Sequence, residues 1–441
     1  MRTNIMLAVA ALLLPASALA TPKIQHWQTV DGARVYFVEN HNLPMLDVAV
    51  GFAAGSAYDS ADKSGLAGLT HSLLDLGVEG LNEDDISRKL ADIGAQMGGS
   101  IDLDRALVSL RTLSNTAERD QALDILARVL QRPLFPESVL TREKTRLIAS
   151  IKEADTKPEN IADKTFNKAV FGDHSYGLRL SGEVASVEKV QRADIEKFYR
   201  EHYTAKTAVV AIMGDVTRAE AESIAKQLTA RLPTENSIAR IAPVAMTIKP
   251  SEQRIDHPAT QSHILIGAPG VARNDPDYFP LYVGNYILGG GGFVSRLMDE
   301  VREKRGLAYS VYSYFVPMQQ PGVFQIGLQT KKEQADEALK LVRATLKEFT
   351  NKGPTQKELR AAKQNIIGGF PLRIDSNKKI VEYLGVIGFY GLPLTYLDDF
   401  VGKIDKVSAA QIHDAFKRRV IPEAMATVIV GAPKTQAGAG Q

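Results

Sequence analysis

The sequence predicts an α+β fold of two homologous domains, each a mainly antiparallel sheet with helices on one face. Two passages recur 217 positions apart, and strand and helix patterns mix without the regular βαβ order. With 441 residues, of which 44% are hydrophobic and 24% charged, the chain is long enough for two cores. The net charge is only +2, without a basic block, so no nucleic-acid partner is expected.

The first twenty residues are typical of a secretory signal peptide. A positive residue precedes an apolar run over 5–14, and small residues at 18–20 form a cleavage signal. A membrane anchor is the alternative, but it needs about 20 apolar residues, and no later stretch is long enough either. The chain has no cysteine, so its core alone must hold it together. We therefore expect a periplasmic protein without a membrane span.

The repeat indicates duplication of a whole domain. "VEKVQRADIEKFYREHYTAKTAVVAIMGD" begins at Val187, and "IDKVSAAQIHDAFKRRVIPEAMATVIVGA" begins at Ile404. Each passage predicts a helix followed by a β-branched strand that ends at a glycine, Gly214 or Gly431. "LDVAVGF" and "HILIGAP" are similar strands farther upstream in each copy. A period this long excludes a solenoid of short repeats.

The duplication divides the chain into five segments. After the signal peptide (1–20) we expect an N-terminal domain over 22–232 and a C-terminal domain over 255–434. The segment 233–254 has polar, proline-bearing ends, which predict a linker. The tail 435–441 lacks core-forming residues and is expected to be disordered.

The first half begins with strand patterns and continues with helical ones. Strands are predicted at 34–39 and 46–52, as a hairpin around "NHNLP". Apolar residues at helical spacing then predict helices at 64–76, 83–93, 117–131, 136–154 and 158–170.

The first of these helices carries a candidate metal ligand. Its leucines form one apolar stripe, and His71 and Asp75 lie four residues apart on another face. A zinc peptidase needs two ligands on such a helix, a third from elsewhere and a carboxylate base. In the arrangement H-x-x-E-H, two histidines bind zinc and the glutamate accepts a proton from water. Here Leu74 replaces the base and Asp75 the second histidine.

Three passages together resemble the pitrilysin and insulinase family, which includes the mitochondrial processing peptidase. They are "DGARVYFVENHNLPMLDVAVGFAAGSAYDSADKSGLAGLTHSLLDLG", "FGDHSYGLRLSGE" and "LGGGGFVSRLMDEVREKRGLAYSVYS". The resemblance covers nearly the whole chain after the signal peptide. It implies the two-domain metallohydrolase fold and, in active members, a zinc site in the first half.

The same resemblance places the third zinc ligand on a later helix, shortly before a proline. Counted back from Pro158, that position is Ser150, and Glu143 matches a supporting acidic residue. Leu74, Asp75 and Ser150 therefore all depart from the active pattern, and no metal is expected in this chain. Two alternatives stay open for His71: a hydrogen bond to Asp75 on the helix surface, or a weak metal site with Asp75 and Glu143 or Glu153.

The second half retains a pair that the family uses on substrate. The resemblance implies that Arg302 and Tyr309 reach across a cavity to a zinc site, hold substrate carbonyl groups and stabilise the oxyanion. Guanidinium and phenol groups suit that chemistry. The alternative is a surface ion pair of Arg302 with Glu300 or Glu303, with Tyr309 only packing. Arg305 is a competing candidate, but its spacing to Tyr309 does not fit.

Four consecutive glycines, Gly289, Gly290, Gly291 and Gly292, precede this pair. A phosphate-binding loop would need Gly-Lys-Ser/Thr next, and Phe293 follows instead. In the non-catalytic subunit of the mitochondrial processing peptidase, a glycine-rich loop here contributes to substrate handling. A flexible substrate loop and a simple loop leading into a helix both stay open.

The sequence thus predicts a zinc-free subunit of a heterodimeric periplasmic metallopeptidase. Its partner would be an H-x-x-E-H chain of the same family that carries the zinc, and its substrates would be peptides or unfolded proteins. The alternatives are a non-enzymatic peptide-binding or assembly scaffold and an active enzyme with an atypical site.

Overall fold

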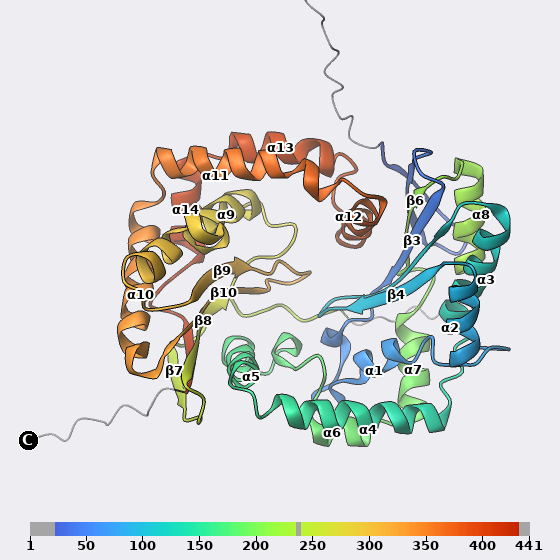
Figure 1. Cartoon of the computed structure of the whole chain (residues 1–441), viewed down its shortest axis with the longest axis horizontal. Helices are drawn as coiled ribbons and strands as arrows, with labels where there is room; N and C mark the ends of the chain where they lie inside the picture. Colours follow the sequence, from blue (N-terminus) through green and yellow to red (C-terminus); the bar gives the residue numbers. More distant parts are fainter. Residues whose placement is uncertain (1–22, 235–239, 432–441) are drawn as a thin grey trace, which may run out of the picture.

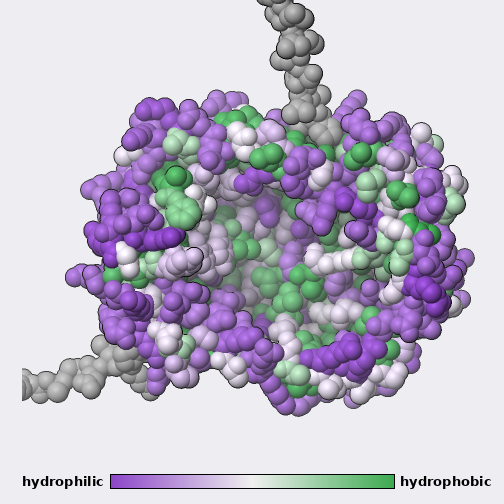
Figure 2. Space-filling view, viewed as in Figure 1, coloured by the Kyte–Doolittle hydropathy of each residue, from purple (hydrophilic) through white to green (hydrophobic). Residues whose placement is uncertain are grey.

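The computed structural model describes residues 23–234 and 240–431 as two halves that face each other across a central hollow (Figures 1 and 2). Figure 2 shows hydrophobic residues inside the hollow and a mostly hydrophilic surface around it. The predicted signal peptide (1–20) and tail (435–441) lie outside the described residues. No helix among the described residues is long and apolar enough to cross a membrane.

Within the described residues, the first half contains a six-stranded sheet in the order β1-β2-β6-β3-β5-β4. Only β2 and β6 pair in parallel; their neighbours are antiparallel. The strands are β1 (Gln25–Gln28), β2 (Arg34–Glu39), β3 (Met45–Phe52), β4 (Gln96–Ile101), β5 (Ala106–Leu113) and β6 (Val209–Gly214).

The second half repeats this topology in a five-stranded sheet of order β7-β11-β8-β10-β9. Again one pair, β7 and β11, is parallel. The strands are β7 (Ser251–Ile255), β8 (Gln261–Pro269), β9 (Ser310–Phe315), β10 (Val323–Lys331) and β11 (Ala426–Val430). The two recurring passages end in the equivalent strands β6 and β11. A glycine with a positive φ is the last residue of β6 (Gly214) and directly follows β11 (Gly431). The predicted duplication and α+β fold class are confirmed.

Two sequence-based assignments of strands need correction. β2 and β3 do not form a hairpin, because β6 lies between them and pairs with both. All six residues of β6 are buried, as expected for a central strand covered on both faces. The predicted linker 233–254 is also too long, because Ser251–Ile255 pairs with β11 as an edge strand of the second sheet.

Helices of each half cover the outer face of its own sheet (Figure 1). Four predicted helices of the first half agree with the structure within one residue at each end. The first-half helices are α1 (Leu66–Ser72), α2 (Glu83–Asp92), α3 (Thr116–Gln131), α4 (Glu137–Ala154), α5 (Pro158–Phe171), α6 (Val184–Lys189), α7 (Arg192–His202) and α8 (Arg218–Thr229). The second-half helices are α9 (Tyr278–Asn285), α10 (Ala335–Lys352), α11 (Gln356–Gly369), α12 (Asn377–Tyr390), α13 (Tyr396–Lys406) and α14 (Ala409–Arg419).

The halves exchange one helix each. α12 packs on β3 and β6 of the first sheet, and α5 packs on the equivalent strands β8 and β11 of the second. The period-2 alternation of β2 follows from this exchange. Val35 and Phe37 join the core under the first half's own helices, whereas Tyr36 and Val38 join the core that contains α12. The exchange fixes how the two halves face each other.

Candidate functional site

The helix that carries His71 is shorter than the sequence indicated. Asp59 fixes its start, because its carboxylate accepts hydrogen bonds from the backbone N–H groups of Gly65 and Ala67, both at 2.9 Å. The helix ends at Ser72, not at residue 76. Asp75 therefore follows the helix, and it does not share a helical face with His71 as the i, i+4 spacing predicted.

His71 is packed against the edge strand β4. A Cβ atom built on Gly99 would lie 2.7 Å from Nε2 of His71, so only a glycine allows this approach. Nδ1 of His71 is buried and has no hydrogen-bond partner among the described residues. Burial lowers the pKa of His71 to about 4, so the ring is neutral near pH 7. The alternative of a hydrogen bond between His71 and Asp75 is not realised in the structure.

Leu74 belongs to the core of the first half. Its side chain is 2% exposed and packs in the cluster formed by the sheet and its outer helices. The position at which the family's active members hold a general base is therefore closed to water in this chain.

The nearby carboxylates are paired with arginines. Arg142 contacts Glu83 at 2.6 Å and Glu143 at 2.7 Å, and Arg146 contacts Glu143 at 2.9 Å. Burial, with a contribution from the charge of Glu83, raises the pKa of Asp75. The guanidinium of Arg142 thus neutralises the carboxylates that a metal ion would otherwise require.

The two remaining candidate ligands lie on α4 and face solvent. Ser150 is exposed, and Glu153 pairs with Lys157 at 2.7 Å. Within residues 23–234 and 240–431, no group of three or more His, Asp or Glu side chains is arranged to hold a metal ion. The candidate ligands, a buried imidazole at His71, an arginine-paired Glu143 and a lysine-paired Glu153, do not fit the zinc site of the family's active members.

Arg302 and Tyr309 of the second half lie together. Cζ of Arg302 is 5.2 Å from the ring centroid of Tyr309 and 4.7 Å from that of Phe293. Tyr309 is 77% exposed and Phe293 is 67% exposed. The ion pair of Arg302 with Glu303 is long, 3.6 Å from Nε to Oε1. The partly buried guanidinium of Arg302 thus lies against two exposed aromatic rings beside the edge strand β9.

The neighbouring basic side chains are engaged elsewhere. Arg305 contacts Glu300 at 2.6 Å, and Lys304 contacts both Glu300, at 2.6 Å, and Asp299, at 2.7 Å. Arg305 is therefore committed to a local ion pair, whereas the guanidinium of Arg302 stacks on two rings. This arrangement favours Arg302 over Arg305 as the residue that can contact another molecule.

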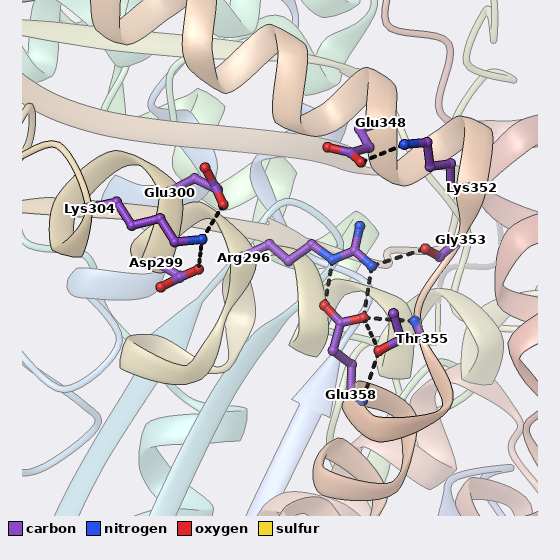
Figure 3. A network of polar contacts seen from close by, with 9 residues as sticks. All are labelled: Arg296, Asp299, Glu300, Lys304, Glu348, Lys352, Gly353, Thr355 and Glu358. Carbon is purple, nitrogen blue, oxygen red and sulfur yellow. Dashed lines mark hydrogen bonds and ion pairs between the residues drawn. The ribbon is translucent and has the colours of Figure 1, made fainter.

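A partly buried network holds the segment that carries Arg302 (Figure 3). Arg296 donates to both carboxylate oxygens of Glu358, at 2.5 and 2.8 Å, and to the carbonyl of Gly353 at 3.1 Å. Although burial opposes ionisation, hydrogen bonds from Arg296 and Thr355 lower the pKa of Glu358 to about 2. A bidentate pair of this kind fixes orientation as well as distance. Arg296 therefore anchors the π-helical turn η6 (Met298–Glu303) against α11.

The four glycines do not form an open loop. Gly289 and Gly290 end the π-helical turn η4 (Tyr286–Gly290), and only Gly292 has a positive φ, of 62°. A Cβ on Gly289 would lie 2.4 Å from Oγ of Ser313, so this glycine allows close packing against β9. Both interpretations of the segment, a flexible substrate loop and a simple loop leading into a helix, remain predictions.

Sequence reasoning missed two residues of these sites. Phe293 is the second ring against which Arg302 lies, and its signal was an aromatic residue directly after a glycine run. Gly99 shapes the place of His71, and its signal was the pair of glycines inside a strand.

Comparisons with known proteins place this geometry in a family. The sequence profile "Insulinase (Peptidase family M16)" matches residues 34–183, and "Peptidase M16 inactive domain" matches residues 189–366. A crystal structure described as a peptidase M16 inactive domain from Pseudomonas fluorescens is 39% identical and has a TM-score of 0.90. It covers 94% of this chain and 98% of its own. The chain belongs to the M16 (insulinase) peptidase family.

Curated relatives carry different names. The non-peptidase homolog YmxG of Helicobacter pylori is 29% identical and covers 92% of each chain. An uncharacterized zinc protease of Streptomyces coelicolor is 28% identical over 83% of this chain and 81% of its own. The mitochondrial-processing peptidase subunit beta of Blastocladiella emersonii is 22% identical over 84% and 80%. These names describe proteins of different activity, so they do not tell whether this chain is a peptidase. That question depends on the residues at the position of the zinc site, around His71.

Proposed function

We propose that the protein is the zinc-free subunit of a heterodimeric periplasmic metallopeptidase. The single observation that carries the proposal is an asymmetry between the halves. The first half lacks the base and the second imidazole that hydrolysis requires, whereas the second half holds the partly buried Arg302 against the exposed Tyr309. The chain would supply this pair to the zinc site of an H-x-x-E-H partner subunit.

The chemistry of the pair supports this role. A phenol O–H donates to developing negative charge on a peptide carbonyl oxygen, and a guanidinium offers a fixed fork of donors. Tyr309 is accessible to a partner because most of its side chain is exposed. The name of the Helicobacter pylori relative, a non-peptidase homolog, agrees with a non-catalytic chain, and the name of the processing-peptidase subunit beta agrees with an enzyme of more than one chain.

Peptides or unfolded proteins are the proposed substrates. The strands β4 and β9 are edge strands at equivalent positions in the two sheets, and an extended peptide can add to such an edge by backbone hydrogen bonds. His71 packs behind β4, and Tyr309 immediately precedes β9. Periplasmic location is proposed from the predicted signal peptide and the lack of cysteine.

A second candidate function is a non-enzymatic scaffold that binds peptides or assembles with other proteins. The name of the non-peptidase homolog favours it. In that case Arg302 and Tyr309 would be dispensable for the biological activity, which separates the two proposals.

Reconstitution tests the leading proposal. The chain is purified alone and after co-expression with H-x-x-E-H members encoded beside it, and each preparation is assayed on unstructured peptides. We expect cleavage only by the mixed complex, which should elute as a heterodimer. Zinc-dependent cleavage by the single chain would refute the proposal. A stable complex whose activity is unchanged by Tyr309→Phe and Arg302→Ala would favour the scaffold.

A further inference from the structure

A cavity of about 430 Å³ at the seam between the two halves is lined by four basic side chains. Arg34 and Lys206 come from the first half, Arg240 from the connection between the halves, and Arg273 from the second half. Four basic side chains that are far apart in the sequence thus line one cavity and make it positively charged. The candidate sites around His71 and Arg302 do not include any of them.

The positive charge of this cavity is not balanced by its own lining. No Asp or Glu is among the lining residues, and within the described residues no ion pair is formed by Lys206, Arg240 or Arg273. Arg34 makes one hydrogen bond, to the carbonyl of Gly388 at 2.8 Å. Four cations around one cavity repel each other, so an anion between them would relieve that repulsion.

One carboxylate lies behind the cavity wall. Asp104 is fully buried and accepts hydrogen bonds from the hydroxyl of Tyr390 at 2.9 Å and the backbone N–H of Gln319 at 2.6 Å, and both residues line the cavity. It also accepts a hydrogen bond from Tyr176 at 2.5 Å. These donors saturate Asp104, which offsets at most one of the four positive charges.

Arg273 supplies a second, independent observation. Its Nε atom is buried and has no hydrogen-bond partner among the described residues. Its Cζ lies 5.2 Å from the ring centroid of Tyr390, so the guanidinium plane is held in place by stacking. A buried guanidinium nitrogen without an acceptor is uncommon and indicates a missing partner.

We propose that this seam pocket (Arg34, Lys206, Arg240 and Arg273) binds a small, multiply charged oxyanion of the phosphate class. Three guanidinium groups and one ammonium group offer many N–H donors and a high positive charge to a bound molecule. Phosphate and pyrophosphate match them, because each carries several oxygen acceptors and a high negative charge in a small volume. Because the pocket takes residues from both halves, the bound anion stabilises the arrangement in which the halves face each other.

Calorimetric titration and thermal unfolding of the full chain with inorganic pyrophosphate test this proposal at constant ionic strength. We expect saturable binding and a rise in Tm. Lys206→Met with Arg240→Met should weaken binding about tenfold or more, because both side chains are exposed and their removal leaves the core unchanged. Lys152→Met with Lys357→Met, two exposed lysines outside the pocket, is the control with the same change in net charge.

The outcomes distinguish binding of pyrophosphate at the seam pocket from attraction by the net charge of the whole protein. Retained binding in the control double variant, together with the loss in the Lys206/Arg240 variant, supports the seam pocket. Equal weakening in both variants would show that only the overall charge matters and would overturn the proposal. Absence of saturable binding and of any shift in Tm would also overturn it. Binding of citrate without binding of pyrophosphate would refute the phosphate class.

Discussion

The guanidinium of Arg302 stacks on the ring of Tyr309, with Cζ 5.2 Å from the ring centroid. Arg302 belongs to the π-helical turn η6, and Tyr309 directly precedes β9. The ion pair of Arg296 with Glu358 fixes the position of that turn. The stacking leaves the phenol hydroxyl and most of the ring accessible, since Tyr309 is 77% exposed. A pair of fixed geometry whose phenol is exposed is suited to contact a molecule from outside the chain.

Tyr309→Phe tests whether the hydroxyl serves a partner's reaction. In the reconstituted heterodimer we expect kcat to fall about 10- to 100-fold, because one donor to the developing oxyanion is lost. The free energy of unfolding should change by less than about 0.5 kcal/mol, because the side chain is exposed. Tyr278→Phe in α9, outside the edge strand β9, is the matched control and should leave kcat unchanged. An unaltered kcat in the Tyr309 variant would contradict the assigned role.

Gly99→Ala tests the packing of His71 against β4. The added methyl group would lie 2.7 Å from Nε2 of His71 and 2.5 Å from the backbone oxygen of Leu107, so the strand or the imidazole must move. We expect a loss of about 1–3 kcal/mol in the free energy of unfolding, measured with urea. Gly98→Ala is the matched control, since a Cβ atom there would lie 3.8 Å from the hydroxyl oxygen of Ser109, an ordinary contact distance. Equal stability of the two variants would show that the close approach is not maintained.

The pH dependence of stability tests the burial of His71. Its pKa falls from 6.5 in the unfolded chain to about 4 in the folded one, so the unfolded state binds the proton first as the pH decreases. The stabilisation is complete above pH 6.5 and is lost as the pH falls toward 4, by up to about 3 kcal/mol. His71→Gln should remove this component, which appears as the difference between urea unfolding curves of the two proteins at each pH. A difference that is constant between pH 4 and 7 would contradict the burial.

The local elements and the duplication could be predicted from the sequence, because they depend on short-range patterns. Strands, helices and the recurring passages follow apolar periodicity, and the glycines that end both copies have a positive φ. The prediction that β2 and β3 form a hairpin was wrong because β6, from a distant part of the chain, lies between them in the sheet. The packing of α5 and α12 on the sheet of the opposite half could not be predicted either, since apolar periodicity does not tell which sheet a helix covers.

The candidate sites could likewise be predicted only in part from the sequence. The absence of the catalytic base at Leu74 follows directly from residue identity. The early end of α1 does not, because Leu73 and Leu74 continue an apolar pattern after the helix has stopped at Ser72. The ion pairs of Arg142 with Glu83 and Glu143 depend on α2 and α4 meeting in space, so the sequence could not show that Glu143, a candidate ligand of the weak metal site, is paired with arginine.

Leu74→Glu tests whether the catalytic base can be restored by its residue alone. The leucine is 2% exposed in the core, so a carboxylate there would lose its hydration without gaining a partner. We expect a loss of about 3 kcal/mol or more in the free energy of unfolding and no peptide cleavage. Leu74→Met, which conserves volume and polarity, should cost less than about 1.5 kcal/mol. A Leu74→Glu variant that is as stable as the parent and cleaves peptides with zinc would show that the position is open to water, contrary to the packing of this core.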